Sequence, residues 1–332
     1  MDKAKWTAQS RRRNLAALVL GFVLLYGMTQ TGLISMQYQG IIITIGIYVL
    51  LAASLNLTTG VLGELVLGHA GFMSIGAYTA ALFTLHMDLP GMVEFPLALL
   101  VGGGLAAVFG VFIGMPALRL RGDYLAIVTL GFGEIIRVVI QNLTITGGGR
   151  GLYGIDEYTT FPWVFWIAAL SVAVMYSMIG TRQGRAILSL RENEIAAEAV
   201  GVPSTRYKVL AFTLSSFFAG VAGGLYAHYI TVLDPATFDF NMSIEILVMV
   251  VLGGMGSFTG SVLAAVVLTL LPELLRDLAD YRMLIYSVVL VLMMILRPQG
   301  LLGKREFSLS RFWEKAAALV KKPAAAGGKG EK

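Results

Sequence analysis

Two opposite charges lie inside an apolar stretch of the chain, at Glu134 and Arg137. Because they are three residues apart, they share one face of a helix and can form an ion pair. A charge at the centre of a membrane costs about 2.5–3.5 kcal/mol on insertion scales, so its presence needs a physical reason. Two interpretations stay open: a polar surface that faces a water-filled path or another subunit, or a structural pair that neutralises itself.

Asn56, Glu64 and His69 form a second polar group where two apolar stretches meet. Glu64 could line a path through the protein or lie at the membrane edge, and the edge is favoured because no basic residue is nearby in sequence. The pattern LGxxG occurs beside this group at Leu67–Phe72 and again at Leu252–Ser257. Transporters built from repeats place broken helices at corresponding positions, whereas close packing of small residues is the alternative.

Motifs for catalysis, metal binding and nucleotide binding are missing from the sequence. It has three His without HExxH spacing, no GxSxG motif and no Cys, which argues against an intramembrane hydrolase and a metal site. The glycine-rich stretch Thr146–Gly154 lacks the phosphate-loop pattern GxxxxGK[ST]. We therefore predict no enzyme, no cofactor and no metal, and we expect any ATP hydrolysis to occur in separate subunits.

The composition is that of a polytopic membrane protein. Of the 332 residues, 57% are hydrophobic and 14% are charged, against about 25% charged in soluble domains. Abundant Gly suits close helix packing in a bilayer. Spans of about 20 apolar residues, or fewer where short or broken, are predicted at Asn14–Ile34, Tyr38–Leu57, Val66–Leu85, Phe95–Leu118, Tyr124–Asn142, Pro162–Ile179, Val209–Thr231, Ile244–Gly253, Gly260–Leu271 and Met283–Leu296.

The distribution of basic residues predicts the orientation of these spans. If every segment crosses and the N-terminus is cytoplasmic, most of the 25 basic residues lie inside, as the positive-inside rule requires. The rule also accounts for the net charge of +5, so no nucleic-acid partner is expected. We predict an all-α polytopic membrane protein with about ten (8–10) transmembrane segments, some short or broken, and cytoplasmic termini.

Three regions follow from this topology. Residues 1–13 form a cytoplasmic N-terminal segment, and residues 14–302 form the transmembrane domain. In residues 303–332, aromatic and basic side chains alternate before an Ala-, Gly- and Lys-rich end. This pattern predicts an interfacial helix on membrane lipids, followed by a disordered tail.

A polar helix at about 184–206 is the longest polar interruption between spans. It carries Arg191, Glu192, Glu194 and Glu198, and Gly201 is expected to end it. Apolar residues recur near helical spacing and predict a short amphipathic helix. Its periodicity fits two functions equally, docking of a cytoplasmic partner or connection along the membrane interface.

Four motifs occur in order at Leu55–Leu82, Leu118–Val139, Thr146–Ile155 and Leu190–Phe212. Together they resemble permease subunits of branched-chain amino-acid ABC importers, of the LivM-like type. The resemblance covers nearly all of the chain from Leu55 to Gly303. It implies a bacterial plasma (inner) membrane location, a second related permease as heterodimer partner, two cytoplasmic ATP-binding subunits and an extracytoplasmic substrate-binding protein.

The resemblance also places the importer coupling loop, the EAA motif, at Glu192–Gly201. Gly201 comes one position later than in the general pattern, which puts the contact residues in doubt. The positions implied to couple the chain to the ATPase are Arg191, Glu192, Glu194, Ala196, Ala197, Glu198 and Gly201. Candidate pathway or intramembrane polar residues are Asn56, Glu64, His69, Glu134 and Arg137.

The predicted function is import of branched-chain or other hydrophobic amino acids as the permease of an ATP-driven importer. Related permeases handle urea, short amides or other amino acids, and these substrates are the alternative within the family. An ion-coupled secondary transporter is the alternative of a different class. It would need intramembrane ion ligands, for which Glu134 is the one candidate, and Arg137 is placed to neutralise it.

Overall fold

The computed structural model describes residues 3–31, 35–87, 89–276, 281–296, 300–301 and 303. The chain divides into two compact units, one of Met1–Ser35 with Glu306–Lys332 and the other of Met36–Arg305. In the first unit, α1 spans Lys3–Gln30, so this helix begins well before the predicted apolar segment. The interfacial helix and tail predicted for residues 303–332 lie outside the described residues, apart from Gly303.

The second unit is helical, apart from an isolated bridge between Leu152 and Leu233 in its described part. Each apolar segment predicted there coincides with a helix. The helices are α2 (Met36–Asn56), the π-helix η1 (Leu57–Leu62), α3 (His69–His86), α4 (Gly91–Ala117), α5 (Asp123–Asn142), η2 (Gly148–Arg150), α6 (Phe161–Ile179), α7 (Arg182–Glu192), α8 (Glu194–Ala199), α9 (Ser204–Ile230), η3 (Pro235–Phe238), α10 (Phe240–Gly253), α11 (Phe258–Leu274) and α12 (Arg282–Leu296).

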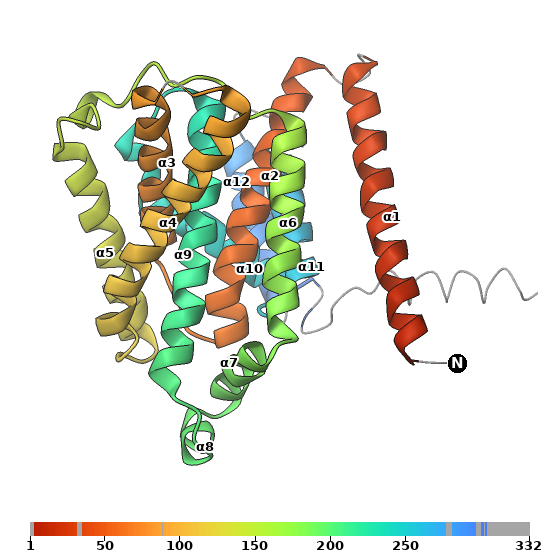
Figure 1. Ribbon diagram of the computed structural model, residues 1–332, viewed down its shortest axis with the longest axis vertical. Helices are drawn as coiled ribbons and strands as arrows, with labels where there is room; N and C mark the ends of the chain where they lie inside the picture. Colours follow the sequence, from red (N-terminus) through yellow and green to blue (C-terminus); the bar gives the residue numbers. More distant parts are fainter. Residues whose placement is uncertain are drawn as a thin grey trace, which may run out of the picture. The chain divides into compact units, whose positions relative to one another are not determined.

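Four stretches in the described residues are long and apolar enough to cross a membrane. They are Met36–Leu62, Gly91–Ala117, Phe161–Ile179 and Ser204–Ile230. The last of these contains α9, which lies in the middle of the bundle (Figure 1) and packs on α3 and α4. A Cβ added to Gly76 would lie 2.1 Å from the carbonyl oxygen of Gly220. The small residues therefore let these helix backbones touch, as in other membrane bundles.

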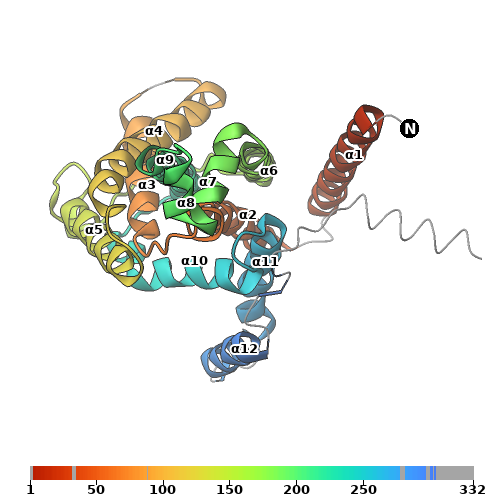
Figure 2. The same ribbon diagram turned by 90° about the horizontal axis from the view of Figure 1, so that it is seen from below.

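Helix α10 lies across the bundle. Figure 2 shows it from the side, whereas α9 is seen along its axis. At its start, the hydroxyl of Ser243 accepts a hydrogen bond from the Ala70 amide at 3.1 Å. In the turn after its end, the Gly256 amide donates to Asn56 Oδ1 at 2.8 Å. Both ends of α10 are therefore fixed at the depth where α2 ends and α3 begins.

Helix α11 then returns toward the start of α2. It packs along α2, and Gln37 near the start of α2 donates to Glu273 Oε1 at 2.5 Å. The segment α10–α11 therefore enters the bundle and leaves it on the same side. The sequence left open whether Ile244–Gly253 and Gly260–Leu271 each cross the membrane, and this geometry favours a re-entrant pair within the predicted range of 8–10 segments. The periodicity of a short apolar helix gives its burial but not its direction, which here is set by contacts with α2 and α3.

Candidate functional site: the loop between α6 and α9

Two short helices make up the α6–α9 loop (residues 180–203). Asn193 separates α7 from α8 because its backbone is extended, with φ −159° and ψ 105°. Its side-chain oxygen accepts a hydrogen bond from the Ala196 amide at 3.0 Å, which caps the new helix. The prediction of one helix over about 184–206 was therefore wrong, since residues 204–206 already belong to α9.

The break at Asn193 sends the apolar side chains of the two helices in different directions. On α7, Ile187 and Leu190 are buried against the bundle. Around α8, Ile195 is 73% exposed and Val200 is 80% exposed. In a continuous helix these four residues would already spread over about 220° of the circumference, so near-helical spacing alone does not put them on one face. The structure therefore gives the loop two sides. The inner side, with Ile187 and Leu190, is buried against the bundle, and the outer side, with Ile195 and Val200, is exposed.

The implied coupling residues divide between these two sides. Ala196, Glu192 and Glu198 are exposed, whereas Ala197 is only 3% exposed. Ala197 therefore packs inside this chain, and its contact with another subunit stays a prediction that this burial disfavours. Gly201 has φ +89° and no other atom within 4 Å of an added Cβ. It ends α8 as predicted, with the Val202 amide bonded to the Ala197 carbonyl at 3.0 Å.

An ion cluster fastens the loop to the bundle. Lys208 Nζ lies 2.6 Å from Glu64 Oε1 and 2.9 Å from Glu194 Oε1. Arg121 reaches the other oxygen of Glu194 at 3.5 Å. The four charges sum to zero, and the Lys208 side chain is only 5% exposed. The cluster thus joins the segment after η1, the loop between α4 and α5, α8 and the first turns of α9.

Lys208 and Arg121 were missed as site residues by sequence reasoning. Glu64 looked unpartnered because its lysine is 144 positions away in the chain. One signal was available, since Lys208 falls near the start of an apolar span, where the helix dipole is unfavourable to a cation. A lysine at such a position needs carboxylates around it, although the sequence does not say which ones.

A polar cluster lies deeper in the bundle, where α2, α3, α9 and α10 meet. His69 Nε2 is 2.8 Å from the hydroxyl of Ser54, and Ser215 donates to the Ser54 carbonyl at 2.6 Å. His69 is 1% exposed and Asn56 is fully buried. The structure thus brings these two predicted residues to one depth, but it joins Glu64 to the ion cluster instead.

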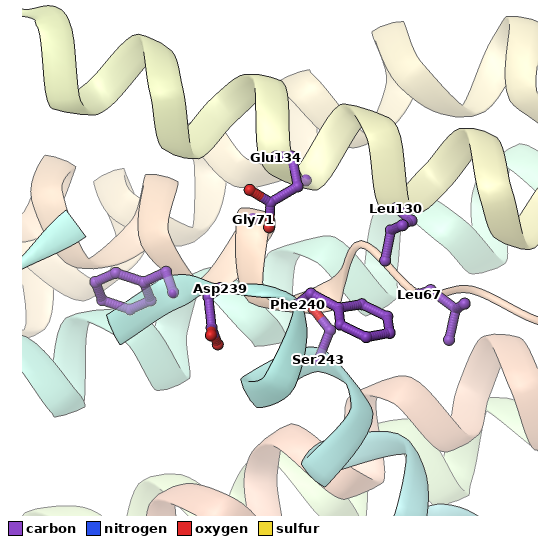
Figure 3. A pocket seen from close by; sticks show the side chains of 9 residues that line it. Leu67, Gly71, Leu130, Glu134, Asp239, Phe240 and Ser243 are labelled. Carbon is purple, nitrogen blue, oxygen red and sulfur yellow. The ribbon is translucent and has the colours of Figure 1, made fainter. Parts of the chain in front are cut away.

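Glu134 and Arg137 form the ion pair that their spacing predicts, with 2.8 Å between Arg137 Nε and Glu134 Oε2. The side chains are 35% and 24% exposed, respectively. Figure 3 shows Glu134 beside a shallow recess, which has no room for a water molecule. It is lined by Leu67, Gly71, Leu130, Gly133, Glu134, Phe238, Asp239, Phe240 and Ser243.

Long apolar helices, and helices that begin or end inside the bundle, define the class of this protein. Segments of this kind line the central sites of membrane transporters, where helix breaks free backbone groups. Both LGxxG stretches fall at such breaks, one across the start of α3 and the other across the end of α10. The fold and the site are therefore those of a multi-pass membrane transport protein.

Sequence comparison gives the family. Residues 37–297 match the family described as branched-chain amino acid transport system / permease component. The chain belongs to this family and is a permease subunit that is not itself an enzyme. Its relatives include the high-affinity branched-chain amino acid transport system permease protein LivM of Salmonella typhimurium. The two are 43% identical over 77% of this chain and 68% of the relative.

Two more distant relatives are also similar to the chain. The permease protein LivH of Salmonella typhimurium is 24% identical over 78% of this chain and 92% of its own length. The ribose import permease protein RbsC of Haemophilus influenzae is 26% identical over 80% of this chain and 83% of its own length. No solved structure matches the chain.

Proposed function

We propose that this chain imports branched-chain or other hydrophobic amino acids as one permease of an ATP-driven importer, coupled to its ATPase through the outer side of α8. The observation that carries the coupling site is the contrast within the α6–α9 loop. Ile195 and Val200 are 73% and 80% exposed on a loop that an ion cluster holds to the bundle. Apolar side chains that are exposed in the isolated chain often mark a surface that a partner protein covers in the complex.

The docking contact is of the helix-in-groove kind. Ile195, Ala196 and Val200 enter an apolar groove of an ATP-binding subunit, and the exposed Glu192 and Glu198 meet basic residues at the rim of that groove. Glu194 takes no part in this contact, because Lys208 and Arg121 hold it on the inner side. Movement of the docked helix then passes through the ion cluster to α9 and to the segment before α3.

The assembly contains a second related permease, two cytoplasmic ATP-binding subunits and an extracytoplasmic substrate-binding protein, in a bacterial inner membrane. The existence of both LivM and LivH among the relatives supports the paired permease. In our topology the α6–α9 loop and both termini are cytoplasmic. With α10–α11 re-entrant, the crossings are α1 to α6, α9 and α12.

The face of α5 that carries Glu134 and Arg137 is proposed to meet the second permease or the substrate route. A half-exposed ion pair in the middle of an apolar helix is costly against lipid. The exposed neighbours Ile127, Ile135 and Val138 are apolar, so the pair is isolated on a face that otherwise suits lipid. A protein surface or a water-lined route is a better environment for it.

The test is purification of the complex with the outer side of α8 altered. The wild-type chain is expected to co-purify with an ATP-binding subunit and a second permease. The double variant Ile195→Asp/Val200→Asp should keep the second permease and lose the ATP-binding subunit. The matched control is Tyr153→Asp, which places the same charge on an exposed aromatic residue in the loop before α6.

Two outcomes would contradict parts of the proposal. Retention of the ATP-binding subunit by the double variant would move the docking site away from α8. A wild-type chain that purifies without any such subunit, and takes up substrate on an ion gradient, would favour the secondary-transporter alternative. Substrate class is tested separately by uptake of labelled leucine, urea and ribose into vesicles that hold the complete complex.

A further inference from the structure

The turn between α10 and α11, Gly254–Ser257, is tight and depends on glycine. Gly254 has φ +106° and Gly256 has φ +91°, values that residues with a side chain rarely adopt. The Ser257 amide closes the turn on the Gly254 carbonyl at 3.0 Å. The direction of both helices of the re-entrant segment therefore depends on this short piece of backbone.

Arg191 of α7 lies directly against this turn. A Cβ added to Gly256 would be 2.7 Å from Arg191 Nη1, and one added to Gly63 would be 3.0 Å from Arg191 Cγ. The aliphatic part of Arg191 thus packs under the end of η1, and its guanidinium reaches the turn. Within the described part of the chain, no carboxylate forms an ion pair with Arg191. The sequence-based expectation that it contacts the ATPase stays a prediction, although the side chain extends toward Gly63 and Gly256 of the permease.

The α2–η1 junction holds the other side of the same turn. Asn56 Oδ1 accepts the hydrogen bond from the Gly256 amide at 2.8 Å. A Cβ added to Gly60 would be 2.3 Å from the Gly256 nitrogen, so η1 and the turn are in backbone contact. The turn is therefore clamped between η1 and the end of α7.

The contact between η1 and the Gly254–Ser257 turn has two features that suit a hinge. Short π-helices such as η1 are frequent at functional sites. Two buried polar atoms here, Asn56 Nδ2 and Thr59 Oγ1, have no hydrogen-bond partner among the residues that the structure describes. Leaving such groups unpaired costs free energy in the observed arrangement, so a movement of η1 or the turn that let them find partners would recover part of that cost.

We propose that Arg191 is a positioning residue that carries movement of the α6–α9 loop into the re-entrant segment α10–α11. When α7 shifts, the guanidinium moves the Gly254–Ser257 turn against η1, and α10 changes its place across the bundle. This inference rests on the proposed function, because the movement comes from an ATPase docked on α8. Arg191 itself makes no contact with that partner.

The test compares transport with ATP hydrolysis in the complete complex, reconstituted in vesicles. Arg191→Ala should leave the ATP-binding subunit bound and its hydrolysis active, while substrate moved per ATP falls by about tenfold, a usual size for coupling between sites. Gly256→Ala should give the same uncoupling, because its methyl group displaces the guanidinium. Arg191→Lys should restore part of the ratio, since its stem still packs on Gly63.

Matched controls separate this role from simple damage. Arg185→Ala removes another arginine of α7, whose guanidinium bonds only the nearby Gly180 carbonyl among the described residues. Gly154→Ala imposes a similar backbone strain, at φ +82°, with no atom within 4 Å of the new methyl. Both controls should keep the wild-type ratio of transport to hydrolysis.

Three results would overturn the inference. Loss of the ATP-binding subunit from Arg191→Ala would make Arg191 a docking residue. An unchanged ratio, with both activities lowered equally, would make it a structural residue only. A wild-type ratio and rate would remove it from the mechanism. A wild-type complex without any ATP-binding subunit would instead refute the proposed function itself, so the two failures are distinguishable.

Discussion

The two sides of the α6–α9 loop contain the same kinds of residue and meet different surroundings. On the inner side, Ile187 and Ala197 are buried, and Glu194 is paired with Lys208 at 2.9 Å. On the outer side, Ile195 and Val200 are exposed to whatever covers them in the assembly. Isoleucine, alanine and glutamate therefore occur on both sides, and the two sides differ in the direction that these side chains take.

The comparison shows how a loop can transmit force. A docking surface on a loosely held loop would move without moving the membrane helices. Here the inner side ties α8 to α9 and to the segment after η1 through a buried lysine and two partly buried carboxylates. A movement of the outer side must therefore either break buried ion pairs or carry the bundle with it.

The largest expected effect is on the inner side, from Lys208→Met. This change leaves Glu64 and Glu194 close together without their shared cation. Because these carboxylates are 15% and 23% exposed, the cost should be somewhat below the about 3–5 kcal/mol expected for a fully buried pair. The thermal unfolding midpoint of the purified permease should fall clearly. A variant as stable as the wild type would show that the cluster does not fasten the loop.

A double variant sharpens this test. In Lys208→Met/Glu64→Gln the uncompensated charge is reduced, so the second substitution should recover part of the lost stability. The non-additivity measures the coupling of the two residues. If Glu64→Gln made the Lys208→Met protein still less stable, the 2.6 Å pair would not be the stabilising contact.

A smaller effect is expected from Ala197→Leu. Ala197 is 3% exposed, and forcing a larger side chain into a packed site costs about 1–3 kcal/mol. Its neighbour Ala196 is exposed, so Ala196→Leu is the matched control. We expect the unfolding midpoint to fall only for Ala197→Leu. Equal behaviour of the two variants would remove the distinction between inner and outer sides.

Asn193 sets that distinction, and its replacement should have a still smaller effect on stability. Asn193→Ala removes the cap of α8, for about 1 kcal/mol. Faster hydrogen exchange at the Ala196 amide would report the loss. Thr181→Ala removes the equivalent cap of α7, where Thr181 Oγ1 accepts from the Gly184 amide at 3.2 Å. It should leave exchange at Ala196 unchanged.

Much of this fold was predictable from the sequence because membrane spans are marked by composition. The apolar segments, the ion pair of Glu134 and Arg137, and the stop at Gly201 follow from length, spacing and glycine chemistry. The direction of α10 was not predictable, because it depends on contacts with residues far away in the chain. The partners of Glu64 were missed for the same reason, since Lys208 is 144 positions away.

The two faces of the α6–α9 loop were not predictable either, for a local reason. Helical periodicity assumes an unbroken helix, and one extended residue at Asn193 changes which side chains share a face. Asparagine is a common cap, but it also occurs inside helices, so its type alone does not reveal the break. The exposed side of α8 therefore required the three-dimensional structure.

The smallest effect on stability, and the most informative effect on function, is expected from Val200→Asp. Val200 is 80% exposed, and substitutions at such surface positions usually change the free energy of unfolding by less than about 0.5 kcal/mol. Binding of the ATP-binding subunit should nevertheless weaken by about 2 kcal/mol or more, because the new charge enters an apolar contact.

Leu190→Asp on the inner side should do the reverse and destabilise the permease itself, since Leu190 is buried. Thermal unfolding of the isolated chain, with titration of the ATP-binding subunit, measures the two quantities separately. If Val200→Asp lowered stability and left binding unchanged, the outer side would pack within the permease, and the docking surface would have to lie elsewhere.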